Sequence, residues 1–153
     1  MAMMMSDDGL NFIARREELR LKAYKPTSND VWTIGYGHTG ADVYQGQTCT
    51  PDEAMAWLKS DSASAVNSVN NMVSVTLKQC EFDALVDLVF NVGAGAFAKS
   101  RALRYLNEGY KQNFCIQAFS RDDGFTKQAG QILEGLVNRR NKEKILFTKG
   151  IYI

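Results

Sequence analysis

The first apolar positions of the chain recur at helical spacing. Leu10, Ile13 and Ala14 fall on one face of a helix, and Glu17 falls on the same face at its end. Ser6 is a good N-cap residue, and the two aspartates that follow it suit the positive end of a helix dipole. The pattern predicts an N-terminal helix that ends in a carboxylate placed against apolar surface.

Residues 22–48 follow a different pattern, rich in glycine, aromatic and β-branched residues, which predicts a small sheet with turns. In a strand over 31–39, side chains alternate between two faces. One face carries the bulky residues, and the other carries small ones: Val31, Thr33, Gly35, Gly37 and Thr39. Glycines at alternate positions let either a ligand or another stretch of backbone approach closely.

The rest of the chain predicts helices. Thr50, Pro51 and Glu53 are typical of a capped helix start and open a helix over 51–70. Apolar residues at steps of three and four predict the most hydrophobic helix over 79–92. Ser100 is a suitable cap for a further helix ending near Gly109, and two more helices are predicted over 111–120 and 134–147.

This order of elements, a helix, a small sheet and then helices, predicts an α+β protein with a helix-rich second half. The length of 153 residues fits one domain. We expect a single domain over 1–153, with an N-terminal lobe at about 10–50, a connecting helix at 51–70 and a helical lobe at 71–153.

Composition excludes several classes of protein. A net charge of +1 gives no argument for binding nucleic acid or an anionic membrane. Three widely spaced cysteines without a Cys/His cluster predict neither a metal site nor a disulfide framework. The first residues, MAMMMSDDGLNF, lack a basic region and a long apolar run, so we expect neither a signal peptide nor a membrane anchor.

Glu17 is the first candidate for chemistry. A carboxylate held against apolar surface favours its protonated form, which is the condition for a general acid. A glutamate near a helix end is also commonly just solvated, and its position alone leaves both interpretations open.

Three sequence blocks resemble a known family. LRLKAY followed by TIGYGHT, then FDALVDLVFNVGAGAFAKSRALRYLN, and finally GLVNRRNKEKILF are similar to the bacteriophage lysozymes (endolysins) of glycoside hydrolase family 24. The likeness covers about residues 8–148 in the family's order. It implies a lysozyme-like fold with a small β-containing lobe, a long connecting helix and a helical lobe. It also implies hydrolysis, without a cofactor, of the bond between N-acetylmuramic acid and N-acetylglucosamine in peptidoglycan.

The family's catalytic pattern is Glu, eight residues, Asp, five residues, Thr. The resemblance places the Glu at Glu17 and the Thr at Thr33, but Pro26 stands at the aspartate position and the turn is one residue longer. Our hypothesis is that the KPTSND turn brings Asp30 to serve instead, because proline, serine and asparagine favour a defined loop. The alternative is that Asp30 only closes the turn. An inverting reaction through a bound water is implied, and the altered turn leaves the stereochemistry open.

Other residues are assigned by the same resemblance. His38 matches a buried, hydrogen-bonded structural histidine. Phe90 and Asn91 match a stretch that contacts sugar, with plain core packing as the alternative for Phe90. Arg139 and Arg140 either meet the acidic peptides of peptidoglycan or pair with nearby carboxylates. Gly35 and Gly37 are the expected glycan-facing positions of the strand.

The leading interpretation is therefore a phage or prophage endolysin that causes host cell lysis. Without a signal sequence it would stay in the host cytoplasm until a holin releases it to the cell wall, and nothing indicates an oligomer, so a monomer is expected. The alternatives are a catalytically impaired peptidoglycan-binding domain, motivated by Pro26, and a lytic transglycosylase, which needs one carboxylate.

Overall fold

A computed structural model of the protein describes residues 2–153. The chain divides into two compact units, one of Leu10–Ala63 and one made of the residues up to Gly9 together with Ser64–Ile153. The first boundary falls within helix α1 (Asp7–Arg16), whose start is capped by the Ser6 hydroxyl, which accepts a hydrogen bond from the Gly9 N–H at 3.0 Å. The predicted cap at Ser6 is confirmed.

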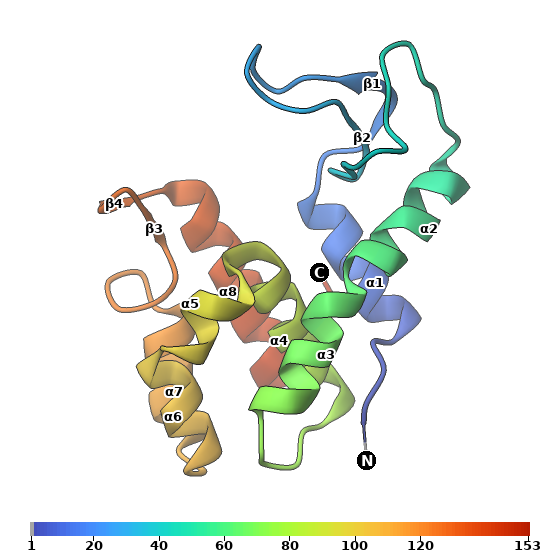
Figure 1. Cartoon of the computed structure of the whole chain (residues 1–153). Helices are drawn as coiled ribbons and strands as arrows, with labels where there is room; N and C mark the ends of the chain where they lie inside the picture. The colour runs from blue at the N-terminus through green and yellow to red at the C-terminus, as the bar shows by residue number, and fades with distance from the viewer. Residues whose placement is uncertain (1) are drawn as a thin grey trace. The chain divides into compact units, whose positions relative to one another are not determined.

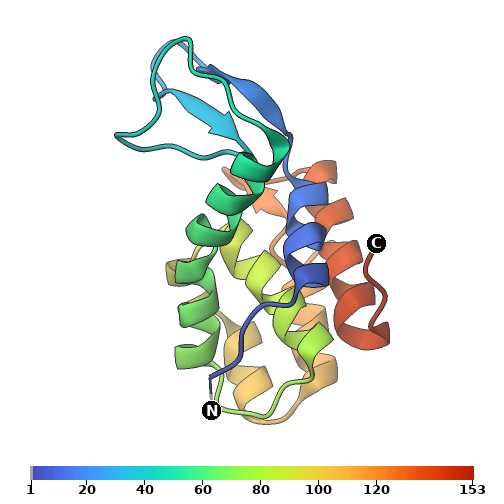
Figure 2. The ribbon, with the colours of Figure 1, turned by 90° about the vertical axis from the view of Figure 1, so that its right-hand side faces the viewer.

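The unit of Leu10–Ala63 contains a two-stranded antiparallel sheet and its long loops (Figures 1 and 2). Strand β1 (Arg20–Tyr24) pairs with β2 (Thr33–Gly35), with an irregularity between Arg20 and Tyr24. The two strands contribute Ala23 and Ile34 to a small buried core that also contains Val43. Partly buried residues pack against it: Trp32, Cys49 and Trp57.

The predicted strand over 31–39 is much shorter in the structure. Gly35 and Gly37 have φ angles of 68° and 84°, which reverse the chain, and Ile34 and His38 then exchange two backbone hydrogen bonds of 2.8 and 2.9 Å. Such φ values are accessible to glycine without strain. The two glycines therefore form a tight turn, and the alternation of faces holds only over the three residues of β2.

The predicted helix over 51–70 is two helices, α2 (Pro51–Asp61) and α3 (Ala63–Met72). The start is as predicted, because the Thr50 side chain and Glu53 form a reciprocal capping box. The helix ends at Ser62, which is buried and whose hydroxyl donates to the Lys59 carbonyl at 3.1 Å. Serine side chains compete for backbone acceptors in this way and interrupt helices.

The second unit is helical and is built around α4 (Gln79–Val92). Its residues from Glu81 to Val89 are all buried, and α4 makes its most extensive contact with α8 (Glu134–Lys149). Figures 1 and 2 show α4 among the other helices of this unit. These are α3, α8, α5 (Ala94–Ala98), α6 (Arg101–Asn107) and α7 (Lys111–Phe119).

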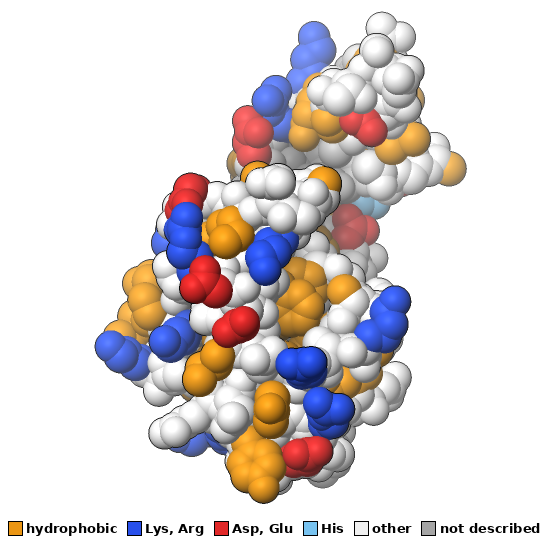
Figure 3. All heavy atoms as spheres, turned by 90° about the vertical axis from the view of Figure 1, so that its left-hand side faces the viewer, with side chains coloured by type: hydrophobic (Ala, Val, Ile, Leu, Met, Phe, Trp, Pro, Cys, Tyr) orange, Lys and Arg blue, Asp and Glu red, His pale blue; other side chains and the backbone are white. Residues whose placement is uncertain are grey.

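The helical unit also holds a small hairpin that the sequence did not predict. Strands β3 (Lys127–Gln128) and β4 (Gln131–Ile132) are joined by Ala129 and Gly130, both with positive φ. Two consecutive positive-φ residues make a tight hairpin turn. Alanine is unusual at the first of these positions, so the sequence lacks the Asn-Gly or Asp-Gly pair that predicts such a turn. The face that Figure 3 shows intersperses basic, acidic and apolar side chains over this unit.

Asp83, on α4, forms hydrogen bonds with residues near both ends of the described chain. Its carboxylate accepts hydrogen bonds from the Ser6 N–H at 3.1 Å and from the Tyr152 hydroxyl at 2.6 Å. A β-carbon at Gly9 would lie 2.5 Å from the Asp83 carboxylate carbon, so any larger residue there would have to displace this carboxylate. Burial and the Asp83 carboxylate raise the pKa of Tyr152 above its usual range. Between residues 2 and 153, no helix is both long and apolar enough to cross a membrane.

Candidate active site

Glu17 lies directly after the last turn of α1. Ile13 and Ala14 of the predicted apolar stripe are buried, whereas Leu10 is half-buried, and Phe12, which the prediction did not include, is fully buried as well. The Glu17 N–H donates to the carbonyls of Ile13 and Ala14, both at 3.2 Å, and its side chain is half-buried. The backbone that carries this carboxylate is thus held by the end of the helix.

The turn between β1 and β2 is exposed from Lys25 to Val31. Its second residue is Pro26, at the position where the family pattern has aspartate. It is closed by Asp30, whose N–H donates to the Thr27 carbonyl at 3.1 Å and whose Oδ2 accepts from the Thr27 hydroxyl at 2.9 Å. Within residues 2–153, the other carboxylate oxygen of Asp30 has no hydrogen-bond partner. Asp30 therefore both closes the turn and presents one oxygen to solvent.

Thr33 follows on β2 and is 6% exposed. Its hydroxyl donates to the Val31 carbonyl at 3.1 Å. A hydroxyl has a single donor and two acceptor sites, so with the proton committed, Thr33 can only accept a further hydrogen bond from a ligand or water.

The two glycines of the strand differ in their surroundings. A β-carbon at Gly35 would lie 3.2 Å from the Ala54 β-carbon and 3.4 Å from the Trp57 ring, so helix α2 packs against this position. At Gly37 a β-carbon would meet nothing within 4 Å. The close approach at Gly35 is thus made by another part of the protein, whereas Gly37 is open.

His38 is hydrogen-bonded, as predicted, but it is half-buried and not buried as expected. Its ring stacks on Trp57 with centroids 4.8 Å apart, Nδ1 lies 2.8 Å from Asp61 Oδ2, and Nε2 lies 2.9 Å from Asp42 Oδ2. Burial by itself would lower the pKa of His38, but the hydrogen bonds with Asp42 and Asp61 outweigh it and raise the pKa above 6.5. His38 therefore links the loop after the strand to the end of α2.

The remaining candidates lie in the helical unit, at the end of α4. Phe90 is half-buried and Asn91 is exposed. Asn91 lines a cavity of about 400 Å³ together with Phe125 and residues of the hairpin and α8. Its side-chain oxygen accepts from Arg140 at 2.8 Å, so the amide NH₂ is the group left to face a ligand.

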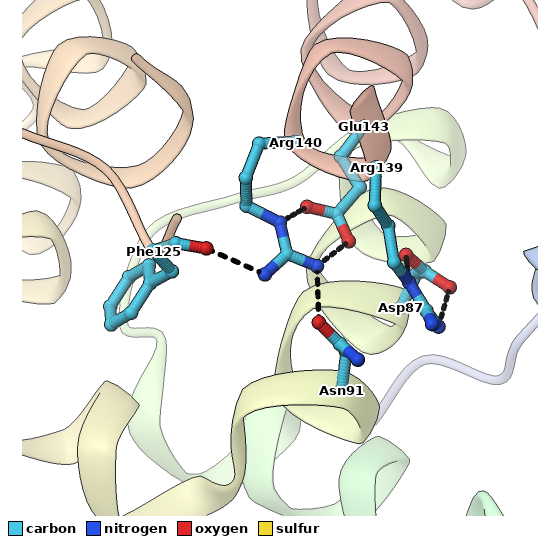
Figure 4. Close-up of polar contacts among 6 residues, drawn as sticks. All are labelled: Asp87, Asn91, Phe125, Arg139, Arg140 and Glu143. Atoms are coloured by element: carbon cyan, nitrogen blue, oxygen red, sulfur yellow. Dashed lines mark hydrogen bonds and ion pairs between the residues drawn. The ribbon is translucent and has the colours of Figure 1, made fainter. Parts of the chain in front are cut away.

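Arg139 and Arg140 are both paired with carboxylates (Figure 4). Arg139 binds the buried Asp87 through two hydrogen bonds of 2.8 and 3.1 Å. Arg140 is fully buried and binds Glu143 through Nε and Nη2 at 2.6 and 2.9 Å. Its remaining hydrogen bonds go to Asn91 and, at 3.1 Å, to the Phe125 carbonyl.

These charges share one buried environment, since Asp87 and Glu143 are both 0% exposed. Burial and the neighbouring Asp87 carboxylate raise the pKa of Glu143, against the opposing effect of Arg140. Burial alone would raise the pKa of Asp87, but hydrogen bonds from Glu143 and Arg139 keep it below its usual value. We refer to Asp87, Arg139, Arg140 and Glu143 as the buried ion cluster.

The structure thus sorts the candidates into two groups. Unit Leu10–Ala63 holds Glu17, Asp30, Thr33, Gly35 and Gly37, and the helical unit holds Phe90, Asn91 and Arg139. Sequence reasoning did not assign the carboxylates that pair with His38 or with the two arginines. Acidic residues within a strongly apolar helix, as at Asp83 and Asp87, are the signal that would have indicated buried partners. In residues 2–153 no group of three or more His, Cys, Asp or Glu side chains is placed to hold a metal ion.

Comparison with known proteins agrees with this architecture. The chain matches the phage lysozyme family over residues 14–143, and it belongs to this family. It is 43% identical to the endolysin of Bacillus phage PZA over 97% of the chain, and spans about half of that relative, 56% of its length. It is 38% identical to the endolysin of Salmonella phage P22, covering 95% of this chain and 98% of that one.

Among solved structures, the muramidase domain of SpmX from Asticaccaulis excentricus matches with a TM-score of 0.84 and 38% identity, over 95% of this chain and 98% of that one. The fold is therefore lysozyme-like, and the predicted α+β class is confirmed.

Proposed function

We propose that this chain is an endolysin-type muramidase that hydrolyses the bond between N-acetylmuramic acid and N-acetylglucosamine in bacterial peptidoglycan and so lyses the host cell. The observation that carries the proposal is the placement of Glu17 at the end of α1, in the same compact unit as Thr33 and the Asp30 turn, in a chain of the phage lysozyme family.

Glycoside hydrolysis needs a proton for the leaving oxygen and a nucleophile or anion near the anomeric carbon. Glu17 is the proposed general acid. Thr33 and Asp30 are proposed to hold the attacking water. Because the Thr33 proton is already donated to Val31, the water would donate one hydrogen to Thr33 and the other to the open oxygen of Asp30. A lone pair of the water oxygen is then free to attack the anomeric carbon. Direct attack by water corresponds to inversion of configuration.

Further contacts with the glycan are proposed for Gly37, Phe90 and Asn91. Gly37 has open space where a side chain would stand, and Asn91 offers an amide NH₂ beside a cavity of about 400 Å³. We keep Gly35 and Arg139 as weaker candidates, because Gly35 packs against α2 and Arg139 is paired with Asp87.

Release to the cell wall is a separate proposal. We infer that the protein is a monomer in the host cytoplasm and reaches the peptidoglycan when a separately encoded holin permeabilises the membrane, as the resemblance to endolysins implies. Expression with and without a co-expressed holin tests it. Lysis that begins without the holin, in cells whose membrane is otherwise intact, would contradict this route.

The test of the activity uses purified peptidoglycan and two single substitutions with matched controls. Glu17→Gln should lower the rate of cleavage by about 10²–10⁴-fold, the usual contribution of a general acid. Glu18→Gln is the control, since Glu18 is exposed and its ion pair with Arg20, at 2.9 Å, lies on the surface. Asp30→Asn should lower the rate less, on the order of tenfold, because a solvent-exposed charge is screened. Asp122→Asn, in another exposed turn, is its control.

Mass spectrometry of the released fragments separates the alternatives. Reducing ends support hydrolysis, whereas anhydro-muramic ends would indicate a lytic transglycosylase. Binding to peptidoglycan without any fragments would make the chain an impaired binding domain, the outcome that Pro26 motivates. An Asp30→Asn variant as active as wild type would remove Asp30 from the mechanism and leave Glu17 in place.

A further inference from the structure

A second cavity of the helical unit has no part in the proposed hydrolysis. It has a volume of about 570 Å³ and lies where the start of α4, the outer face of α7 and the last turns of α8 meet. Small-molecule sites typically have volumes of about 300–1,000 Å³. Its lining combines three cationic side chains with an apolar part: Lys78, Lys111, Lys144, Cys115, Ile116 and Phe147.

The lysines of this cavity are only partly neutralised. Glu81 is its one lining carboxylate, and both oxygens are committed, one to the Lys78 backbone N–H and one to the Lys111 ammonium, each at 2.8 Å. Across residues 2–153, neither Lys78 nor Lys144 has an ion pair. The cavity therefore carries two uncompensated positive charges, although the whole chain has a net charge of only +1.

The apolar part of the cavity consists of a buried, well-packed phenylalanine and an exposed isoleucine. Phe147 is 4% exposed and packs against Phe114 and Phe119, with ring centroids 5.1 and 6.0 Å apart. Ile116 is 50% exposed, so it adds apolar surface that a ligand can reach. Cys115 is half-buried, and burial raises the pKa of its thiol despite the nearby Lys144 and Lys111. The cavity thus places apolar side chains next to cationic groups.

From this combination we infer that the cavity binds a small amphiphilic anion, an alkyl or acyl phosphate or carboxylate. Its anionic group would lie between Lys78 and Lys144, and its apolar body would cover Phe147 and Ile116. A phosphate ion alone would meet flexible, solvent-screened lysines and bind weakly. A neutral apolar molecule would leave the two cations without a partner. Only a ligand with both parts uses both features of the cavity.

The first test measures occupancy through Cys115 in the full-length chain. The rate of alkylation by N-ethylmaleimide is followed at each cysteine by mass spectrometry, with hexyl phosphate as the probe. Cys49 and Cys80 are free thiols outside the cavity and serve as internal references. Alkylation of Cys115 should be about tenfold slower when the probe is at roughly ten times its dissociation constant, with no change at the references.

Two matched compounds test which part of the probe matters. Hexyl glucoside has the same alkyl chain with a neutral head, and inorganic phosphate has the charge without the chain. Neither should protect Cys115 at the concentration at which hexyl phosphate does. Equal protection by either compound, or no protection by hexyl phosphate, would overturn the inference.

Substitutions then locate the anion. Lys78→Gln and Lys144→Gln should each lower the affinity for hexyl phosphate by about tenfold, the loss expected for one charge-assisted hydrogen bond. Lys99→Gln removes an exposed lysine that does not line the cavity and should leave the affinity unchanged. Lys78, Lys144 and Lys99 are all exposed, so the three variants should keep the wild-type melting temperature. Unchanged affinity in both cavity variants would show that the lysines do not bind the anion.

Discussion

The two units of this protein use carboxylates in opposite ways. In the helical unit, Asp87 and Glu143 are fully buried, and their oxygens are bound by Arg139 and Arg140. In unit Leu10–Ala63, Asp30 lies on an exposed turn with one oxygen open, and Asp42 and Asp61 both pair with His38. Buried charges must be paired because desolvation is costly, whereas exposed ones remain available to a ligand.

This contrast separates architecture from chemistry. The buried ion cluster joins α4, α8 and the Phe125 carbonyl, so it stabilises the framework of the helical unit. In the other unit, Asp30 lies on an exposed turn and keeps one carboxylate oxygen open, so it does not hold a buried framework together. A large effect on stability is therefore expected from the first group, and small effects on stability from the second.

The largest expected change in stability follows from Arg140→Met. It leaves the Glu143 carboxylate buried without its guanidinium partner and removes the donors to Asn91 and Phe125. Breaking a buried pair typically costs about 3–5 kcal/mol. Guanidinium chloride unfolding followed by circular dichroism measures it.

The double variant Arg140→Met/Glu143→Leu is the control for that measurement. Replacing both charges with apolar groups should restore part of the lost stability, because no unpaired charge stays buried. If Arg140→Met is as stable as wild type, the cluster does not stabilise the fold and the contrast between the units fails.

A smaller effect is expected from the pH dependence of His38. Its pKa is raised in the folded state by Asp42 and Asp61, so its stabilisation is fully present below the unfolded value of 6.5. The stabilisation is lost as the pH rises through the higher folded value. Screening by solvent keeps the change to the order of 1 kcal/mol or less. Unfolding free energies measured on both sides of this window should show the fall.

The matched variant for His38 is Asp61→Asn, which removes the nearer carboxylate. The fall in stability with rising pH should become shallower in this variant. A pH dependence that is the same in Asp61→Asn as in wild type would mean that another group is responsible.

The smallest effect is expected from Arg121→Ala. Arg121 and Glu134 form an ion pair within the helical unit, but both side chains are more than half exposed. Exposed pairs contribute little because water and salt screen them. The unfolding midpoint should match that of wild type within error. A loss comparable to that of Arg140→Met would show that membership of the helical unit, and not burial, decides the strength of these pairs.

Several local features could be predicted because they depend on neighbouring residues. The cap at Ser6, the capping box at Thr50 and Glu53 and the cap at Ser100 all form as expected. The helices predicted over 79–92, 111–120 and 134–147 agree with α4, α7 and α8 to within two residues. Helix periodicity and capping are short-range properties, so a single sequence carries them.

Other features were missed, two of them local and one dependent on long-range contacts. Ser62 interrupts the helix predicted over 51–70, and Gly35 and Gly37 turn the chain where a long strand was expected. The space beside Gly35 is filled by α2, which no local pattern could indicate. A glycine in the sequence indicates only that no side chain is present. Whether a ligand or another part of the protein fills that space depends on the surrounding packing.

The sequence by itself determined the class, the family resemblance and the positions of Glu17 and Thr33, because motif spacing and periodicity are written along the chain. It also showed that Pro26 replaces the expected aspartate. The tertiary structure decided which charged groups are committed and which stay open. Arg139 binds Asp87, which is distant in the sequence, and Arg140 binds the buried Glu143 one helical turn away. One oxygen of Asp30, in contrast, faces solvent. Burial and pairing arise only when helices pack, since desolvation depends on every neighbour in space.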